Sequence, residues 1–206
     1  MPPRSTRTPH SALRTGRLVR WRNKSVLVDW DRIKRLDFDC RPREFCTPAT
    51  SCCRNYEVAV GPRERKIIDG MLPLAARYLP DLRLEDGFDD PFETTESALR
   101  AIAEDENGNC RFAFRRQAIL LCALHRAALD VGVDPARVKP RACTLWPLAL
   151  GPDNGHLVLS VDPTAESFHC VRLRTRVGDI PCQPIADIIH SLFGKRFLAD
   201  LVEKEG

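Results

Sequence analysis

Four cysteines lie close together near the start of the chain, in a stretch whose composition does not suit a protein core. From Cys40 to Cys53 the sequence reads CRPREFCTPATSCC, so four of the nine cysteines fall within fourteen residues. Arginine, glutamate, serine and two prolines interrupt this stretch, which excludes a continuous buried strand. Free cysteine packs as a small hydrophobic residue, but its reactivity usually decides where it is kept. The stretch therefore predicts a loop that is held either by disulfides or by a metal.

The overall composition favours the metal. The N-terminus lacks the continuous apolar stretch of a secretory signal, and no window approaches the roughly 18 apolar residues of a membrane span. We therefore expect a cytoplasmic protein without a membrane partner, in a compartment that keeps thiols reduced. The odd number of nine cysteines also leaves at least one of them outside any pairing. On these grounds metal ligation is a better prediction than disulfides.

Further cysteines are spread over the rest of the chain, and with the loop they supply enough thiolates for two four-cysteine sites. The predicted metal ligands are Cys40, Cys46, Cys52, Cys53, Cys110, Cys122, Cys143 and Cys170. No pair has the C-x-x-C spacing of a common zinc knuckle, which favours an iron–sulfur cluster, with [4Fe–4S] first and zinc as the alternative. The ninth cysteine, Cys182, lies outside the pattern and is predicted to be a buried structural residue.

A helix is predicted from Gln117 to Val131, with Gly132 as its C-terminal cap. Cys122 and His125 are three residues apart and would face the same side of this helix. His125 is then either a partner of the metal site or a histidine of the core. A separate hypothesis is an enzyme of thiol chemistry that uses Cys122 or Cys143 as the nucleophile and His125 as its base. Nothing in the sequence supplies the group that would orient the histidine.

The remaining patterns predict an α+β fold: one compact mixed domain with short strands, three to four helices and the cysteine-rich loop. No internal repeat and no glycine-rich phosphate loop is present. Alternating or β-branched runs predict the strands, and apolar residues at helical spacing predict the helices. The strands are expected at residues 25–29, 57–60, 110–114 and 156–161, and the helices at residues 62–79, 95–103, 117–131 and 184–203, the last with a break near Gly194.

The charge is distributed unevenly. Residues 1–28 contain seven basic residues and no acidic one, so the remaining 25 basic residues face 28 acidic ones. We predict a basic, disordered tail over residues 1–24, followed by the cysteine-cluster domain over residues 25–206. Such a tail attracts polyanions in principle. A solvated tail is the simpler interpretation, so nucleic acid is not expected as a partner, whereas a protein partner is possible.

The order of the cysteine segments resembles the YkgJ-type cysteine-cluster proteins, a family characterised by zinc- or iron-chelating cysteines. The resemblance covers roughly residues 36–175 and is closest to a branch of unknown function. It rests on the loop that ends in Cys52-Cys53, on Gly108-Asn109-Cys110, on Cys122-Ala123-Leu124-His125 and on Lys139-Pro140-Arg141-Ala142-Cys143 running to Trp146-Pro147. It implies a bound metal or iron–sulfur centre in a cytoplasmic protein, and it makes Cys53, Cys110, Cys122 and Cys143 the strongest candidates for ligands.

Two functions are compatible with these observations. The first is a metal-binding protein whose cysteines hold an iron–sulfur cluster or zinc, with a role in redox chemistry or protein modification. The second is a zinc-stapled module that binds a protein or a polyanion. Both functions require the sulfurs of the loop and of Cys110, Cys122 and Cys143 to converge in the folded chain.

Overall fold

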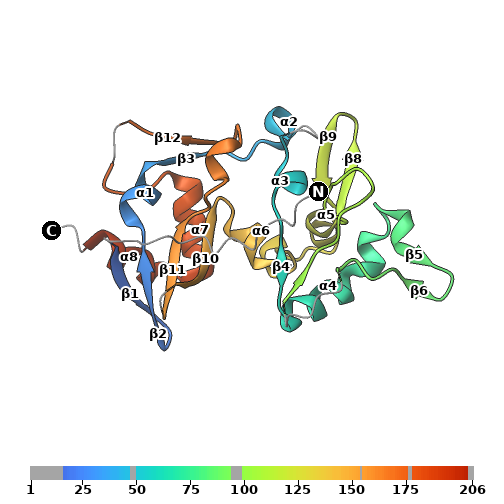
Figure 1. Cartoon of the computed structure of the whole chain (residues 1–206), viewed down its shortest axis with the longest axis horizontal. Helices are drawn as coiled ribbons and strands as arrows, with labels where there is room; N and C mark the ends of the chain where they lie inside the picture. The colour runs from blue at the N-terminus through green and yellow to red at the C-terminus, as the bar shows by residue number, and fades with distance from the viewer. Residues whose placement is uncertain (1–15, 47–49, 94–98, 154, 176–177, 204–206) are drawn as a thin grey trace. The chain divides into compact units, whose positions relative to one another are not determined.

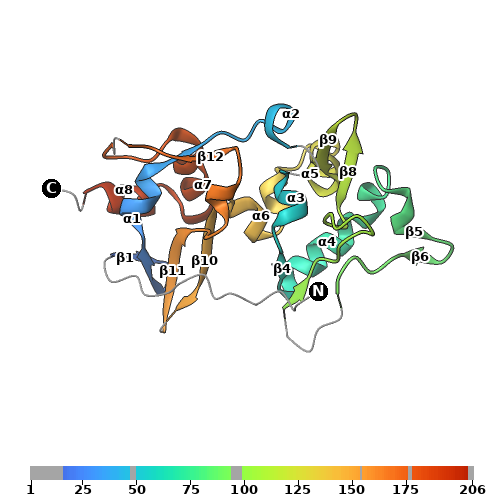
Figure 2. The same ribbon diagram turned by 45° about the horizontal axis from the view of Figure 1, so that its top comes forward.

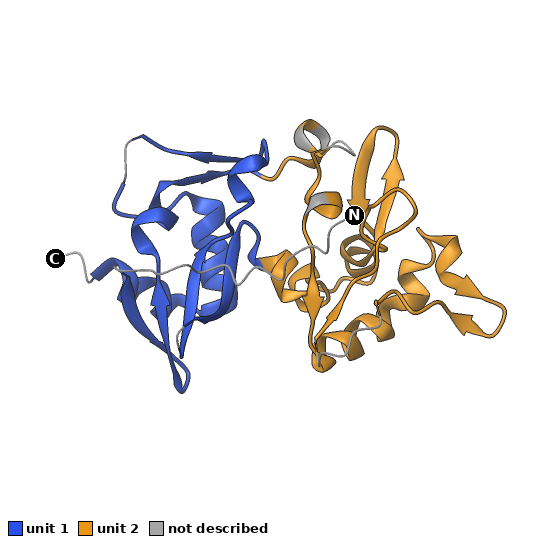
Figure 3. Cartoon of the chain, viewed as in Figure 1, with its two compact units in different colours: residues 1–39, 145–206 blue, residues 40–144 orange. Residues whose placement is uncertain are grey.

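The computed structural model describes residues 16–46, 50–93, 99–153, 155–175 and 178–203. Short helices and several small sheets make up the fold, so the predicted α+β class is confirmed (Figure 1). The chain divides into two compact units, which the sequence did not indicate (Figure 3). Unit 1 comprises residues 1–39 and 145–206, and unit 2 comprises residues 40–144.

A four-stranded sheet is the basis of unit 1. Its strands in spatial order are β1 (Arg17–Trp21), β2 (Lys24–Val28), β11 (His156–Val161) and β10 (Leu148–Asp153). The β1–β2 and β10–β11 pairs are antiparallel, and β2 runs parallel to β11. Val26 and Val28 are buried and alternate with more exposed neighbours, as expected of a strand with one face on a core. The strands predicted at residues 25–29 and 156–161 are thus confirmed, but β1 lies within the predicted tail.

Helices and a two-stranded sheet complete unit 1. They are α1 (Trp30–Arg35), the antiparallel pair β3 (Leu36–Phe38) and β12 (Val171–Leu173), a 3-10 turn at Ala165–Ser167, α7 (Gln183–Phe193) and α8 (Lys195–Glu203). Gly194 has a φ of 90° between α7 and α8, a conformation that residues with a Cβ rarely adopt. The predicted break in the C-terminal helix is therefore confirmed, and Phe193 stacks on Phe197 across it.

Unit 2 contains the cysteine loop, two helices that pack on each other, and small hairpins. Its helices are α2 (Pro42–Phe45), α3 (Cys52–Asn55), α4 (Pro62–Ala75), α5 (Ala123–Asp130) and α6 (Arg141–Leu145, whose last residue belongs to unit 1), with 3-10 turns at Pro80–Leu82 and Pro135–Arg137. Its strand pairs are β4 (Ala59–Val60) with β7 (Arg100–Ala101), β5 (Arg83–Leu84) with β6 (Gly87–Phe88), and β8 (Ala113–Arg116) with β9 (Ile119–Cys122).

The core of unit 2 lies where α4 packs on α5. Ile68 of α4 and Leu124 of α5 are buried there together with Phe112, which precedes β8. Cys110, Cys122 and Cys143 are only partly buried and pack against this core. The thiols therefore lie at the border of the apolar core.

The structure corrects three predicted elements in unit 2. The helix predicted at residues 117–131 is a strand, Ile119–Cys122, followed by a shorter helix, because β8 pairs with β9 and takes up the backbone hydrogen bonds of these residues. Residues 100–101 of the helix predicted at 95–103 form β7, while residues 94–98 lie outside the described part of the chain. The strand predicted to start at Cys110 starts at Ala113, and Cys110 forms an isolated bridge with Glu104.

None of the helices among the described residues is both long and apolar enough to cross a membrane.

Candidate metal centre

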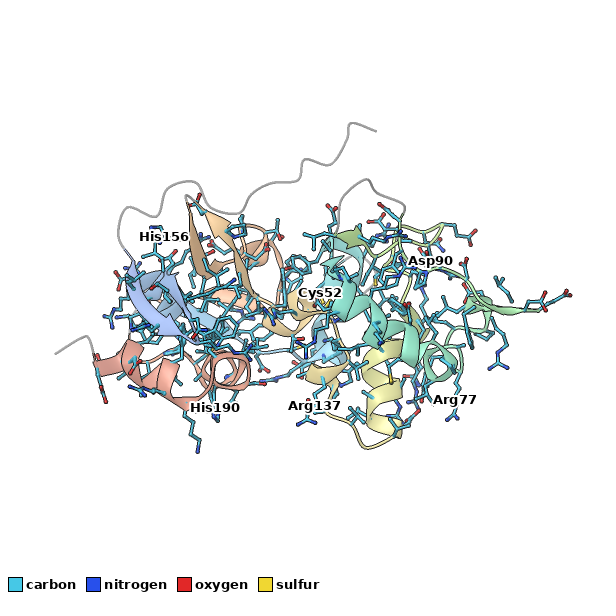
Figure 4. All side chains as sticks on the ribbon, turned by 90° about the horizontal axis from the view of Figure 1, so that it is seen from below. Cys52, Arg77, Asp90, Arg137, His156 and His190 are labelled. Carbon is cyan, nitrogen blue, oxygen red and sulfur yellow. The ribbon has the colours of Figure 1, made fainter. Side chains whose placement is uncertain are left out.

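Cys52 and Cys53 form the first turn of α3, and this places their thiols near each other. Ser51 precedes the helix as its N-cap, and its buried hydroxyl accepts a hydrogen bond of 3.0 Å from the backbone N–H of Cys53. In an extended chain two adjacent side chains would point to opposite sides. The helical turn instead allows the Cys53 thiol to donate a hydrogen bond to the sulfur of Cys52. Figure 4 labels Cys52 among the side chains of unit 2.

A tight loop held by Asp105 positions Cys110. The Asp105 carboxylate accepts hydrogen bonds of 2.8 Å from the backbone N–H groups of Asn107 and Asn109, and one of 2.9 Å from the side-chain amide of Asn109. Gly108 has a φ of 74° in this loop, a conformation that suits the glycine of an Asn-Gly turn. The loop places Cys110 beside α3, and the backbone N–H of Cys110 donates a 2.6 Å hydrogen bond to the carbonyl of Cys53.

The pKa of Asp105 reflects these bonds. Burial tends to raise it, but the hydrogen bonds from Asn109 and Asn107, together with the charge of Arg111, lower it below its usual value. The carboxylate that holds the loop is therefore ionised at neutral pH, as a strong acceptor of three N–H groups should be.

Cys122 is the last residue of β9 and directly precedes α5. Pairing with Ala113 of β8 fixes its backbone position, and the N–H of Ala123 donates to the carbonyl of Phe112 at 2.8 Å. The same strand holds the cysteine loop, because the N–H of Leu120 donates to the carbonyl of Cys46 at 3.2 Å. Figure 2 shows α3 beside the β8–β9 hairpin and α5, and α3 contacts β9 directly.

Cys143 lies in α6, and a carboxylate from a different helix holds the start of α6. One oxygen of Glu64 accepts a 2.7 Å hydrogen bond from the backbone N–H of Arg141, the first residue of α6. The other oxygen accepts a 3.1 Å bond from the N–H of Gly61, the N-cap of α4. Glu64 thus caps two helices at once, and it positions Cys143 relative to α4.

Cys110, Cys122 and Cys143 pack against one apolar core, and Cys110 is hydrogen-bonded to Cys53, so the five thiols lie in one region of unit 2. The hydrogen bond from Cys53 lowers the pKa of Cys52 to about 7; burial opposes this shift and the charge of Lys139 supports it. The same hydrogen bond raises the pKa of Cys53 well above its usual value, and burial and nearby thiolates add to the effect. Burial, with repulsion from the Cys122 thiolate, raises the pKa of Cys110 to about 12. Burial also raises the pKa of Cys143, although Lys139 counteracts part of this.

Lys139 supplies positive charge to this group of thiols. Burial alone would lower its pKa, but the charges of Cys122, Cys143, Cys53 and Cys52 outweigh burial and raise it. The ammonium group is therefore protonated at neutral pH and partly balances one thiolate. His125 lies nearby on α5, where burial and the charge of Lys139 lower its pKa. Neighbouring groups shield only part of His125 and the residue as a whole is exposed, so the alternative of a core histidine is wrong.

Of the eight predicted ligands, five converge: Cys52, Cys53, Cys110, Cys122 and Cys143. Cys46 is partly buried and joins β9 through its backbone, whereas Cys40 is exposed. Cys170 belongs to unit 1, where its carbonyl accepts a hydrogen bond from the N–H of Asp39. Cys182 is buried in unit 1 with its thiol 4.0 Å from the carbonyl oxygen of Phe38, an environment that matches the structural role predicted for it.

The five converging thiols are soft donors of the kind that zinc and iron–sulfur clusters require, so the donor set fits both groups. Their side chains do not yet surround one point. Over the described ranges, no three Cys, His, Asp or Glu side chains are grouped as they would be around a bound ion. Ligation of one ion or cluster by these cysteines would therefore require their side chains to move from the positions they have in this structure.

Comparison with protein-family models, with curated proteins and with solved structures gives no match to this chain. The resemblance to the YkgJ-type family therefore stays a prediction, and the function has to be inferred from the residues of the site.

Sequence reasoning did not single out the residues that support the cysteines. Ser51 precedes a short helix and has the residue type of an N-cap, so its role was open to recognition. Asp105 lies just before an Asn-Gly turn, where aspartate commonly accepts hydrogen bonds from the backbone. Glu64 and Lys139 are different, because their partners lie in segments far away in sequence. The residues next to Glu64 and Lys139 in sequence therefore do not indicate either role.

Proposed function

We propose that unit 2 binds an iron–sulfur cluster, or alternatively zinc, through Cys53, Cys110, Cys122 and Cys143, with Cys52 as a neighbouring thiolate. The observation that carries this proposal is the convergence of five thiols from four separate segments, α3, the Asp105 loop, β9 and α6. A cytoplasmic setting, which keeps thiols reduced, suits such a site.

Ordinary core packing explains this arrangement less well. A cysteine that serves only as a small hydrophobic residue is buried, as Cys182 is in unit 1. The thiols of Cys53, Cys110 and Cys143 instead lie in a group of thiols, and burial together with the charge of neighbouring thiolates raises their pKa values. A bound cation removes this repulsion. Metal binding to such a group is coupled to loss of the thiol protons and to stability of the fold.

The grouping of the thiols is compatible with both an iron–sulfur cluster and zinc. An iron–sulfur cluster supports a role in redox chemistry or protein modification, because the cluster transfers electrons. Zinc at the same cysteines supports a structural role, in which the metal staples the loop to α6 and the unit serves as an interaction module.

The test is purification under strict exclusion of oxygen, followed by measurement of iron, acid-labile sulfide and zinc per chain. Iron and sulfide in about equal amounts support the cluster, and stoichiometric zinc supports the stapled module. Cys143→Ser should lose most of the bound metal, whereas Cys182→Ser is the matched control and should retain it. A wild-type chain free of iron and zinc, which also fails to take up either after reconstitution, would refute the proposal.

A further inference from the structure

Unit 1 has a basic hollow between its edge strand and its last helix. The hollow has a volume of about 470 Å³ and contains arginines from two distant parts of the chain, Arg20 and Arg22 at β1 and Arg196 on α8. Asp200 is the one acidic side chain among its lining residues. The surface is independent of the cysteines, all of which lie outside it.

Packing beneath the hollow fixes its walls. Trp21 of β1 meets Phe193 of α7 edge-to-face, with ring centroids 5.0 Å apart, and the guanidinium of Arg17 donates a hydrogen bond to the carbonyl of Leu201 on α8. The guanidinium of Arg22 lies over the ring of Trp21 at 5.0 Å. This contact restricts the Arg22 side chain and so lowers the entropy that it loses when it binds an anion.

The arginines of the hollow are exposed and available. Arg20, Arg22 and Arg196 have exposed side chains, and none of them forms a salt bridge with an acid in the described part of the chain. Arg32 and Arg174 of unit 1 are by contrast paired with acids, Arg32 with Glu166 at 2.7 Å and Arg174 with Asp37 at 3.3 Å. The hollow therefore keeps an excess of positive charge that its own surroundings do not neutralise.

We propose that this hollow binds the phosphate backbone of a nucleic acid. Guanidinium groups match phosphate oxygens in a two-pronged geometry, and several of them around one concave surface can follow successive phosphates. A membrane surface is a poorer fit, because the lining is mainly polar and Leu18 is the one large apolar side chain exposed beside the arginines. Arg20 and Arg22 belong to a stretch of sequence, residues 1–28, that carries seven basic residues and no acid.

The experiment measures fluorescence anisotropy of a labelled, mixed-sequence single-stranded oligonucleotide of about 20 nucleotides, titrated with the full chain at several salt concentrations. The test variant combines Arg20→Gln, Arg22→Gln and Arg196→Gln. The matched control combines Arg77→Gln, Arg116→Gln and Arg137→Gln, which remove the same charge from exposed positions of unit 2; Figure 4 labels Arg77 and Arg137. Circular dichroism of both variants checks that they fold.

The wild-type chain should bind the oligonucleotide with an affinity that falls as salt rises. The test variant should bind at least about tenfold more weakly. The slope of log K against log salt should also be shallower by about 2, because each single-strand phosphate contact contributes about 0.7 to this slope and the variant lacks three arginines. The control should stay within about twofold of wild type. Equal losses in both variants would show that net charge alone acts, and this would overturn the proposal. Wild-type binding to phosphatidylserine vesicles but not to the oligonucleotide would also overturn it.

Discussion

Binding of a metal at the proposed cysteines should release protons, and the pKa values indicate how many. In the metal-free protein, Cys53, Cys110 and Cys143 have raised pKa values and are protonated at pH 7.5, with Cys110 titrating at about 12. Cys52, with a pKa of about 7, is already mostly ionised at that pH. A metal binds thiolates rather than thiols, so each protonated ligand must lose its proton on binding.

Ligation through Cys53, Cys110 and Cys143 should therefore release about three protons from these residues. The sign of the pH dependence follows directly. A higher pH favours the thiolate form and strengthens binding, and affinity should rise by roughly a thousandfold per pH unit near neutrality if three protons leave together. Ligation by carboxylates or histidines would release about one proton or none, because these groups are already unprotonated at pH 7.5.

The assay is calorimetric titration of Zn²⁺ into the metal-free protein at pH 7.5 in buffers with different enthalpies of protonation. The slope of the observed enthalpy against the buffer enthalpy equals the number of protons released. Cys110→Ser should reduce this number by about one, whereas Cys182→Ser should leave it unchanged. A wild-type value of about one or less, or an equal change in both variants, would refute the assignment of these cysteines as ligands.

Three further outcomes are expected. Glu64→Ala should lower the free energy of unfolding, measured by urea titration, by about 1–3 kcal/mol, because two backbone N–H groups lose their acceptor. It should also weaken metal binding, because Glu64 holds the start of the helix that carries Cys143. Glu64→Gln keeps an acceptor oxygen and should lower the free energy of unfolding by less. Ser51→Ala should cost about 1 kcal/mol through loss of the cap on α3, and a cost near zero would contradict the role of the hydroxyl. The metal-free protein should lose stability as pH rises from 9 toward 12, because the fold raises the pKa of Cys110 from 9.0 to about 12 and thereby favours its neutral form. Denaturation midpoints across this range should fall less in Cys110→Ala, and an equal fall in both would count against this cause.

Local features of the sequence determined much of unit 1 and parts of unit 2. The alternation of β-branched residues places β2 and β11, and Gly194 separates α7 from α8 as predicted. The cysteines are concentrated in a proline-interrupted loop, and the structure brings Cys52 and Cys53 of that loop next to Cys110, Cys122 and Cys143. The predicted strands at β2 and β11 and the break at Gly194 are confirmed because a turn or a strand period depends on residues within one turn of helix or one short strand. The assignment of the cysteines as metal ligands stays a prediction.

Tertiary contacts decided the rest. Residues 119–122 have apolar spacing that suits a helix, but pairing with β8 makes them a strand, so that Cys122 ends a strand instead of facing His125 along a helix. The basic segment at Arg17–Trp21 is a strand because β2 lies beside it and α8 packs against it, and this same packing forms the basic hollow. The pKa of Lys139 is raised by the charges of four thiols that come from α3, β9 and α6. Each of these outcomes depends on groups many residues apart in sequence, whose free energy of contact is gained only when the chain has folded.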